Sequence, residues 1–219
     1  MKDLSIAQEY LVCALNEKGK LPAYDLKRAT CFVGAGLMEL QLEGCISMDQ
    51  KMVELTAELP EKMAYLKPLY DELNPEKAVK IEKVIDEYMI TFTDKALKQL
   101  TQSVKDSLEE NGMMIKSEAG LLNKRQILVP SKEARTGVIE KIRAELLEEG
   151  EITEDVVILT VLLDQADCLK EYFSKYEQKE LKGKLKEIRE SSWGQRAKKM
   201  TEHIEMLIAC IIATGAAAH

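Results

Sequence analysis

Apolar residues recur at helical spacing along most of the chain, and glycine or proline residues separate the resulting segments. Ser5 and Gln8 have the spacing of a capping box, which predicts a helix beginning near residue 5. A second helix is expected over 25–43, with Gly44 directly after its end. Further helices are predicted over 75–89 (with Asn74 as N-cap), 93–111, 131–149, 153–173 and 177–190, and from residue 195 onward.

Two stretches break the helical pattern with short β-prone runs. "CISM" and "KMVELT" follow Gly44 and predict a small hairpin over 45–56. "MMIKSEAGLLNKRQILVP" has two β-prone pieces around a polar middle and predicts a second hairpin over 113–129. The expected fold is therefore mainly α, a single compact helical domain over residues 1–219 with two small β-hairpins.

The helix, glycine and hairpin over 25–56 also suggest a winged-helix unit, so a DNA-associated regulator is the alternative function. The unit lacks a separate basic recognition helix, and Lys51 is the one cation of the hairpin. The net charge of the chain is −7, which argues against general affinity for nucleic acid. We therefore expect no nucleic-acid partner.

Composition favours a soluble, cytoplasmic protein. Apolar residues make up 46% and charged residues 32% of the chain, which is ordinary for a globular protein. The longest uncharged run, 206–218, is shorter than the roughly 20 residues that span a bilayer. The five cysteines are scattered and form no Cys-x-x-Cys pair, which favours buried, reduced thiols.

Candidate catalytic chemistry is sparse. Apart from the terminal residue, His203 is the one histidine, and no cysteines or histidines have metal-ligand spacing. Glu39, Asp164 and Asp167 lie in apolar stretches, where pairing with Lys or Arg inside a bundle is more common than acid–base work. The glycines of "GAG" at 34–36 favour close helix packing over a phosphate loop. We expect no enzymatic activity, no metal and no cofactor.

Positive charge concentrates near the end of the chain. Residues 170–199 hold ten Lys and Arg against five Asp and Glu, and Trp193 lies among them. Such a segment is usually a solvated face, and Trp193 is more often a packing residue. A basic segment with an aromatic residue also suits an anionic membrane surface.

Three sequence blocks resemble the Golgi phosphoprotein 3-like family over nearly the whole chain. "LSIAQEYLVCALNEKGKL" is similar to the family's opening L-T-x-x-E-E-L-L-L-L-x-L-x-x-x-G, and "GLMELQLEGCI" resembles its block E-L-x-L-x-G-R-I. "LLDQADCLKEYF" and "IEMLIACIIA" resemble its late helices in order and spacing.

The resemblance implies a mostly helical, non-enzymatic adaptor domain. Golgi members bind phosphatidylinositol 4-phosphate on the membrane and retain glycosyltransferases. They also self-associate, partly through a hairpin that corresponds to 113–129. This chain lacks their basic N-terminal tail, and Cys45 replaces the arginine that follows the block's glycine, which favours a bacterial member.

The resemblance places a lipid-headgroup site at Tyr24 and Lys98. The family's tryptophan before the second helix corresponds to Tyr24, and one of its paired arginines to Lys98. The other arginine positions correspond to Val33 and Thr101, which cannot form a guanidinium–phosphate clamp. Lys27 and Arg28, one turn from Tyr24, are candidate substitutes.

The sequence therefore predicts a cytoplasmic protein that binds peripherally to anionic membrane surfaces. Its expected partners are an anionic membrane surface or a phosphoinositide headgroup, and further copies of itself through hairpin 113–129.

Overall fold

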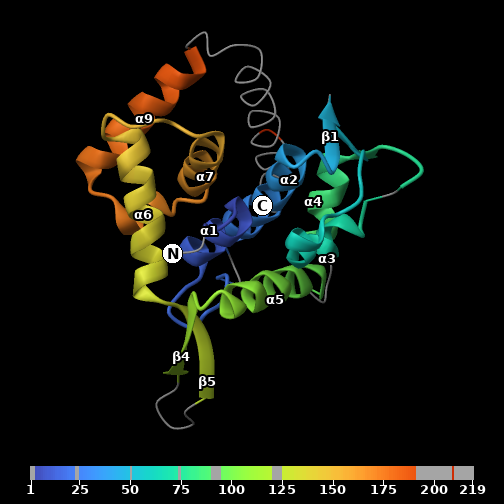
Figure 1. The fold of residues 1–219 in the computed structure, drawn as a ribbon, viewed down its shortest axis with the longest axis horizontal. Coiled ribbons are helices and arrows are strands. Elements are labelled where there is room, and N and C mark those ends of the chain that lie inside the picture. The colour runs from blue at the N-terminus through green and yellow to red at the C-terminus, as the bar shows by residue number, and fades with distance from the viewer. Residues whose placement is uncertain are drawn as a thin grey trace.

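The computed structural model describes residues 3–22, 25–49, 51–73, 75–89, 95–119, 125–190 and 209, and every structural statement below concerns these residues. Helices dominate, and two small antiparallel sheets accompany them (Figure 1). The predicted mainly α fold with small hairpins is confirmed.

The helices are α1 (Ile6–Ala14), α2 (Leu26–Leu42), α3 (Lys67–Tyr70), α4 (Ile81–Met89), α5 (Lys95–Glu110), α6 (Lys132–Leu146), α7 (Glu154–Gln165), α8 (Leu169–Tyr172) and α9 (Lys175–Glu190). A 3-10 helix, η1 (Glu61–Leu66), precedes α3. The strands are β1 (Ile46–Asp49), β2 (Met52–Leu55), β3 (Val79–Lys80), β4 (Met114–Ala119) and β5 (Arg125–Pro130). In the described ranges no helix is long and apolar enough to cross a membrane.

Helix α1 lies at the centre of the core. It packs against α2, α5, α6 and α7, and every one of its residues is buried. The predicted capping box is present, because Ser5 Oγ accepts from the backbone N–H of Gln8 and the Gln8 side chain accepts from the N–H of Ser5. The helix from residue 195, also expected to be central, lies outside the described residues.

The first hairpin is confirmed and gains a third strand. β1 pairs with β2, and β2 pairs with β3 through Val53 and Val79. The predicted helix beginning at Pro75 is wrong, because α4 begins at Ile81. Backbone pairing explains the later start: β3 bonds to the hairpin, and the N–H of Ile81 donates to the carbonyl of Lys51 at 2.8 Å. Asn74 lies outside the described residues.

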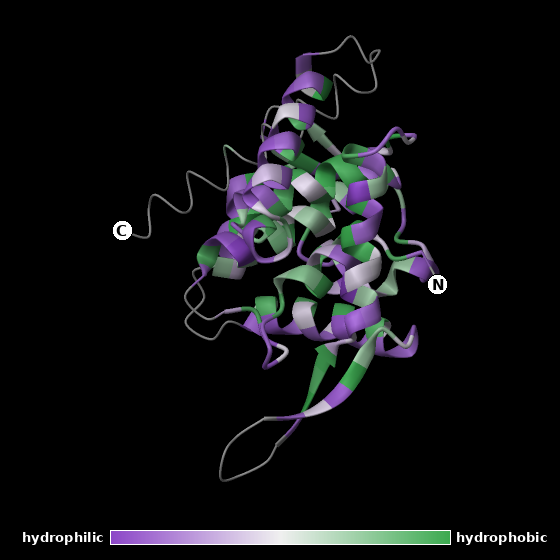
Figure 2. Cartoon of the chain, turned by 90° about the vertical axis from the view of Figure 1, so that its left-hand side faces the viewer, coloured by the Kyte–Doolittle hydropathy of each residue, from purple (hydrophilic) through white to green (hydrophobic). Residues whose placement is uncertain are grey.

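The second hairpin, β4–β5, is confirmed and projects from the helical body (Figures 1 and 2). Its register places Ile115 opposite Val129 and Ser117 opposite Ile127. Ser131 then caps α6 by accepting from the N–H of Ala134 at 3.0 Å, as the sequence predicts.

One predicted long helix is divided in two. α7 ends at Gln165, Asp167 adopts a left-handed φ of 57°, and α8 begins at Leu169. Continuous apolar spacing over 153–173 concealed this break, because buried residues on both sides of the turn satisfy the same pattern. Thr153 flanks α7 as expected, but its hydroxyl donates to Glu145 at 2.7 Å and makes no capping hydrogen bond.

Gly36 confirms the packing interpretation of "GAG". A Cβ atom at this position would lie 2.7 Å from a methyl carbon of Leu69, so α2 packs closely against α3 here and a larger residue would require the Leu69 side chain to shift.

The expectation that Glu39 pairs with a lysine or an arginine is wrong. This buried carboxylate accepts hydrogen bonds from the Tyr65 hydroxyl and, at 2.9 Å, from the N–H of Ala7. The first N–H groups of a helix have no partner within the helix and stabilise negative charge. The N-terminal end of α1 therefore stabilises the Glu39 carboxylate in place of a cationic side chain. Burial raises the pKa of Glu39 above its ordinary value.

Candidate functional site

A cleft of about 970 Å³ opens between the 16–22 loop, the start of α2, the end of α4 and one face of α5. These segments are far apart in the sequence, and the packing of α4 and α5 brings them together. The volume lies within the range of roughly 300–1,000 Å³ that is common for ligand sites.

Four lysines line this cleft: Lys20, Lys95, Lys98 and Lys105. The last three lie on one face of α5 because their spacings of three and seven residues match the helical repeat. Lys20, Lys95 and Lys98 are exposed, whereas Lys105 is half-buried. We call these residues the lysine rim.

Lys105 is held by a backbone group. Its Nζ donates to the carbonyl of Gly19 at 3.0 Å. Burial lowers its pKa, and the positive charge of Lys20 lowers it further against the opposing effect of Asp106. An anion in the cleft would therefore meet a cation that is poorly hydrated.

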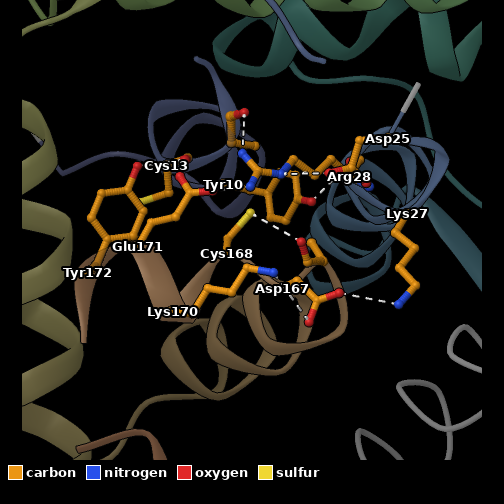
Figure 3. Close-up of polar contacts among 12 residues, drawn as sticks. Tyr10, Cys13, Asp25, Lys27, Arg28, Asp167, Cys168, Lys170, Glu171 and Tyr172 are labelled. Carbon is orange, nitrogen blue, oxygen red and sulfur yellow. Dashed lines mark hydrogen bonds and ion pairs between the residues drawn. The ribbon is translucent and has the colours of Figure 1, made fainter. Parts of the chain in front are cut away.

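Among the described residues that line the cleft, Asp25 is the one acid, and its carboxylate pairs with Arg28. Its side chain accepts from the N–H of Arg28 at 3.1 Å and caps α2, and its other oxygen lies 3.0 Å from Arg28 Nε (Figure 3). Arg28 also pairs with Glu171 of α8. The described lining of the cleft is therefore positive overall.

The residues predicted from the family pattern have different positions in the fold. Lys98 and Thr101 line the cleft. Val33 is 0% exposed and lies in the core, so this position cannot contact a headgroup. Tyr24 lies outside the described residues.

The candidate substitutes Lys27 and Arg28 are absent from the cleft lining. Arg28 is buried between Asp25 and Glu171, and Lys27 pairs with Asp167 at 3.2 Å (Figure 3). Sequence reasoning missed Lys20, Lys95 and Lys105 because only the family's arginine positions were considered. The three-and-seven spacing on α5 was the available signal.

The lining of the cleft also contains apolar residues, which we call the apolar wall. This wall includes Leu21, Leu26, Ala29, Tyr88, Met89 and Leu97. The hydroxyl of Tyr88 donates to the carbonyl of Pro68 at 3.0 Å, so its polar atom is already satisfied. The cleft thus combines an apolar wall with a cationic rim.

The candidate catalytic residues that the structure describes do not assemble into a site. Asp164 pairs with Lys182 at 3.1 Å and Asp167 with Lys27, which are partners of the expected type, but Asp167 and both lysines are exposed, so the pairs lie at the surface and not inside the bundle. The described part of the chain contains no cluster of His, Cys, Asp and Glu that could hold a metal ion. His203 lies outside that part.

The four described cysteines, Cys13, Cys31, Cys45 and Cys168, are buried and free, as predicted. Burial raises the pKa of the Cys31 and Cys168 thiols to about 12. A thiol of this kind is a poor nucleophile, since the thiolate is the reactive form.

The basic segment is largely ion-paired where the structure describes it, which is up to residue 190. Lys170, Lys182, Lys184 and Lys186 each lie within 4.0 Å of a carboxylate. The strongest candidate for an anion site is the lysine rim, because it gathers four lysines from two separate segments around one cavity. Trp193 lies outside the described residues.

The unit over 25–56 gives the winged-helix alternative little support. Helix α2 is buried from Arg28 to Leu40, so its length lies inside the core instead of presenting a surface to DNA. The β1–β2 hairpin buries Met48 and Val53 and pairs with β3.

Comparison with known proteins agrees with the resemblance in the sequence blocks. No curated protein matches the chain. The family described as Golgi phosphoprotein 3 (GPP34) matches residues 6–204, which include every helix and strand from α1 to α9. The chain therefore belongs to the Golgi phosphoprotein 3 family.

Proposed function

We propose that this protein is a non-enzymatic adaptor that docks peripherally on anionic membrane surfaces through the lysine rim. Membership of the Golgi phosphoprotein 3 family supports an adaptor role. The observation that carries the proposal is the cleft itself, whose described lining holds four lysines and one acid, Asp25. Each basic residue near an anionic surface contributes about 1 kcal/mol.

The finer proposal concerns the headgroup. The resemblance implies phosphatidylinositol 4-phosphate binding at Tyr24 and Lys98, but two of the corresponding arginine positions hold Val33 and Thr101. Lysine is a point charge and lacks the planar fork by which arginine binds two phosphate oxygens at once. We therefore propose that the lysine rim responds to anionic charge with little selection between phosphatidylinositol 4-phosphate and other anionic headgroups.

Vesicle flotation at low salt tests both proposals. We expect at least about tenfold more protein on anionic than on neutral vesicles, since two engaged lysines contribute about 2 kcal/mol. We expect vesicles matched for charge with phosphatidylinositol 4-phosphate or phosphatidylserine to bind equally within about threefold. Equal failure to bind all three vesicle types would refute membrane docking. A strong preference for the phosphoinositide would refute only the proposal that the lysine rim binds anionic headgroups with little selection.

We further propose that the β4–β5 hairpin mediates self-association. Among the described strands each pairs only with the other, so neither outer edge joins a larger sheet, and the 16–22 loop approaches β5 near Leu128. Isolated two-stranded hairpins are marginally stable, and open edges readily pair with another chain. Ile115 is 49% exposed on this hairpin, which provides apolar surface for a second copy.

Replacing Ile115 with Asp is expected to reduce the mass measured by light scattering from an oligomer to a monomer, because a charge would be buried unpaired in the contact. Leu42→Asp is the control, because Leu42 is 38% exposed at the end of α2, outside the hairpin. An unchanged mass for the Ile115 variant, or a monomeric parent protein, contradicts this proposal.

A further inference from the structure

The apolar wall of the cleft has no evident role in binding a bare headgroup. Leu26 is 38% exposed at the first position of α2, although large aliphatic side chains are usually buried. Leu21, Met89 and Leu97 are partly exposed beside it in the same cleft. Inositol phosphates and other headgroups are polar and would leave this wall in contact with water.

The lysine rim and the apolar wall face a single cavity. Leu97 and Lys98 are adjacent on α5, and Leu21 follows Lys20 directly in the loop. A ligand that fills the cleft therefore meets an aliphatic surface and a cationic surface at once. Such a site is complementary to a molecule with an alkyl chain and an anionic end.

We infer that the cleft binds a single-chain anionic lipid, with its alkyl chain against Leu26 and its neighbours and its anionic end at the lysine rim. This inference rests on the proposed function, because it uses the same lysines, and it adds a specific occupant to the cleft. The two requirements are separable, since membrane docking needs the charge alone whereas the lipid needs charge and wall together.

Calorimetric titration with three soluble probes, each below its micelle concentration, tests the inference. Octyl phosphate carries both the alkyl chain and the charge, inorganic phosphate carries the charge alone, and octyl glucoside carries the chain alone. Each buried methylene strengthens binding by about fourfold, so two buried methylenes give octyl phosphate more than about tenfold over inorganic phosphate. Contacts with the lysine rim should make octyl phosphate bind more tightly than octyl glucoside by a similar factor. The heat-capacity change should be negative for octyl phosphate, as apolar burial requires.

Leu26→Gln provides the matched test of the wall. It is expected to weaken octyl phosphate binding by about fivefold or more and to leave inorganic phosphate unchanged. Leu42→Gln replaces an equally exposed leucine at the opposite end of α2, outside the cleft, and should change neither. Because both leucines are 38% exposed, either variant should fold.

The outcomes separate this inference from the proposed function. Octyl phosphate that binds no more tightly than inorganic phosphate overturns the inference, even if anionic vesicles bind. Equal binding of octyl glucoside overturns it as well, because the rim would then contribute nothing. Tight octyl phosphate binding without vesicle binding supports the inference and refutes membrane docking.

Discussion

Replacing Lys141 with Met is expected to lower the free energy of unfolding by about 1–2 kcal/mol, because the buried Glu9 carboxyl, whose pKa is already about 7, takes up a proton when its partner is lost. Lys141 Nζ lies 3.1 Å from the Glu9 carboxylate and 2.8 Å from Asp155, so it joins α6 to α1 and α7. The Glu9 side chain is 5% exposed, and without Lys141 its charge has no solvent to stabilise it. Urea unfolding at pH 8 measures the loss.

The double variant Lys141→Met with Glu9→Gln is the control. It also removes the Glu9 carboxylate that Lys141→Met leaves without a partner, so most of the lost stability should return. If the double variant is as unstable as Lys141→Met alone, packing of the lysine chain rather than charge explains the loss.

The same cluster predicts a pH dependence. Burial raises the pKa of Glu9 from 4.5 to about 7, and Lys141, which is shared with Asp155, offsets this effect only in part. A raised folded-state pKa means that this contribution to stability is complete below about pH 4.5 and is lost as pH rises through 7. Relative to Glu9→Gln, the parent protein should lose about 3 kcal/mol of unfolding free energy between pH 4.5 and 8. A constant difference between the two proteins across this range contradicts the prediction.

The pKa of Asp155 is lowered, so the contribution of Asp155 to stability is lost only as pH falls below the ordinary pKa range of an aspartate.

Gly19→Ala is expected to destabilise the protein by about 3 kcal/mol, from a left-handed backbone and a steric clash together. Gly19 has a φ of 64°, and a Cβ atom there would lie 1.9 Å from the carbonyl oxygen of Leu128 in β5. Because the colliding atom belongs to the backbone, the hairpin or the 16–22 loop must move. Urea unfolding gives the free energy.

Gly112→Ala is the matched control for this prediction. Gly112 has a φ of 73°, but a Cβ atom added there would meet no described atom within 4 Å, so only the backbone penalty of about 1 kcal/mol should remain. Equal losses for the two variants would show that the loop and β5 are not in close contact. The carbonyl of Gly19 also accepts a hydrogen bond from Lys105. The Gly19 variant therefore also tests whether the 16–22 loop connects the base of the hairpin to the lysine rim.

Local signals predicted much of the fold. The Ser5 capping box, the Ser131 cap and both hairpins depend on residues close in sequence, and the structure contains each of them. The errors arose where tertiary contacts overrode local preference. Pro75 favours a helix start, but pairing of β3 with the first hairpin delays α4 to Ile81.

The site was harder to predict than the fold. Lys98 was identified through the resemblance, and it lies on the cleft. Lys20 and Lys105 are 85 positions apart, and no local pattern shows that the loop and α5 meet. The basic segment over 170–199 was a further candidate for an anionic surface. Lys184 and Lys186 pair with carboxylates three and four residues on, as helical spacing allows, whereas the partner of Lys182, Asp164, lies on another helix.

The most direct test of the central claim compares two triple variants in flotation on anionic vesicles at low salt. One replaces Lys20, Lys95 and Lys98 of the cleft with Gln, and the other replaces Lys175, Lys179 and Lys186 of α9. Each removes three exposed lysines, so the net charge falls from −7 to −10 in both. If the lysine rim is the docking site, the cleft variant loses about tenfold or more of its vesicle binding and the α9 variant less than about threefold. An equal loss in the two variants would contradict the claim, because the membrane would then respond to total charge and not to the cleft.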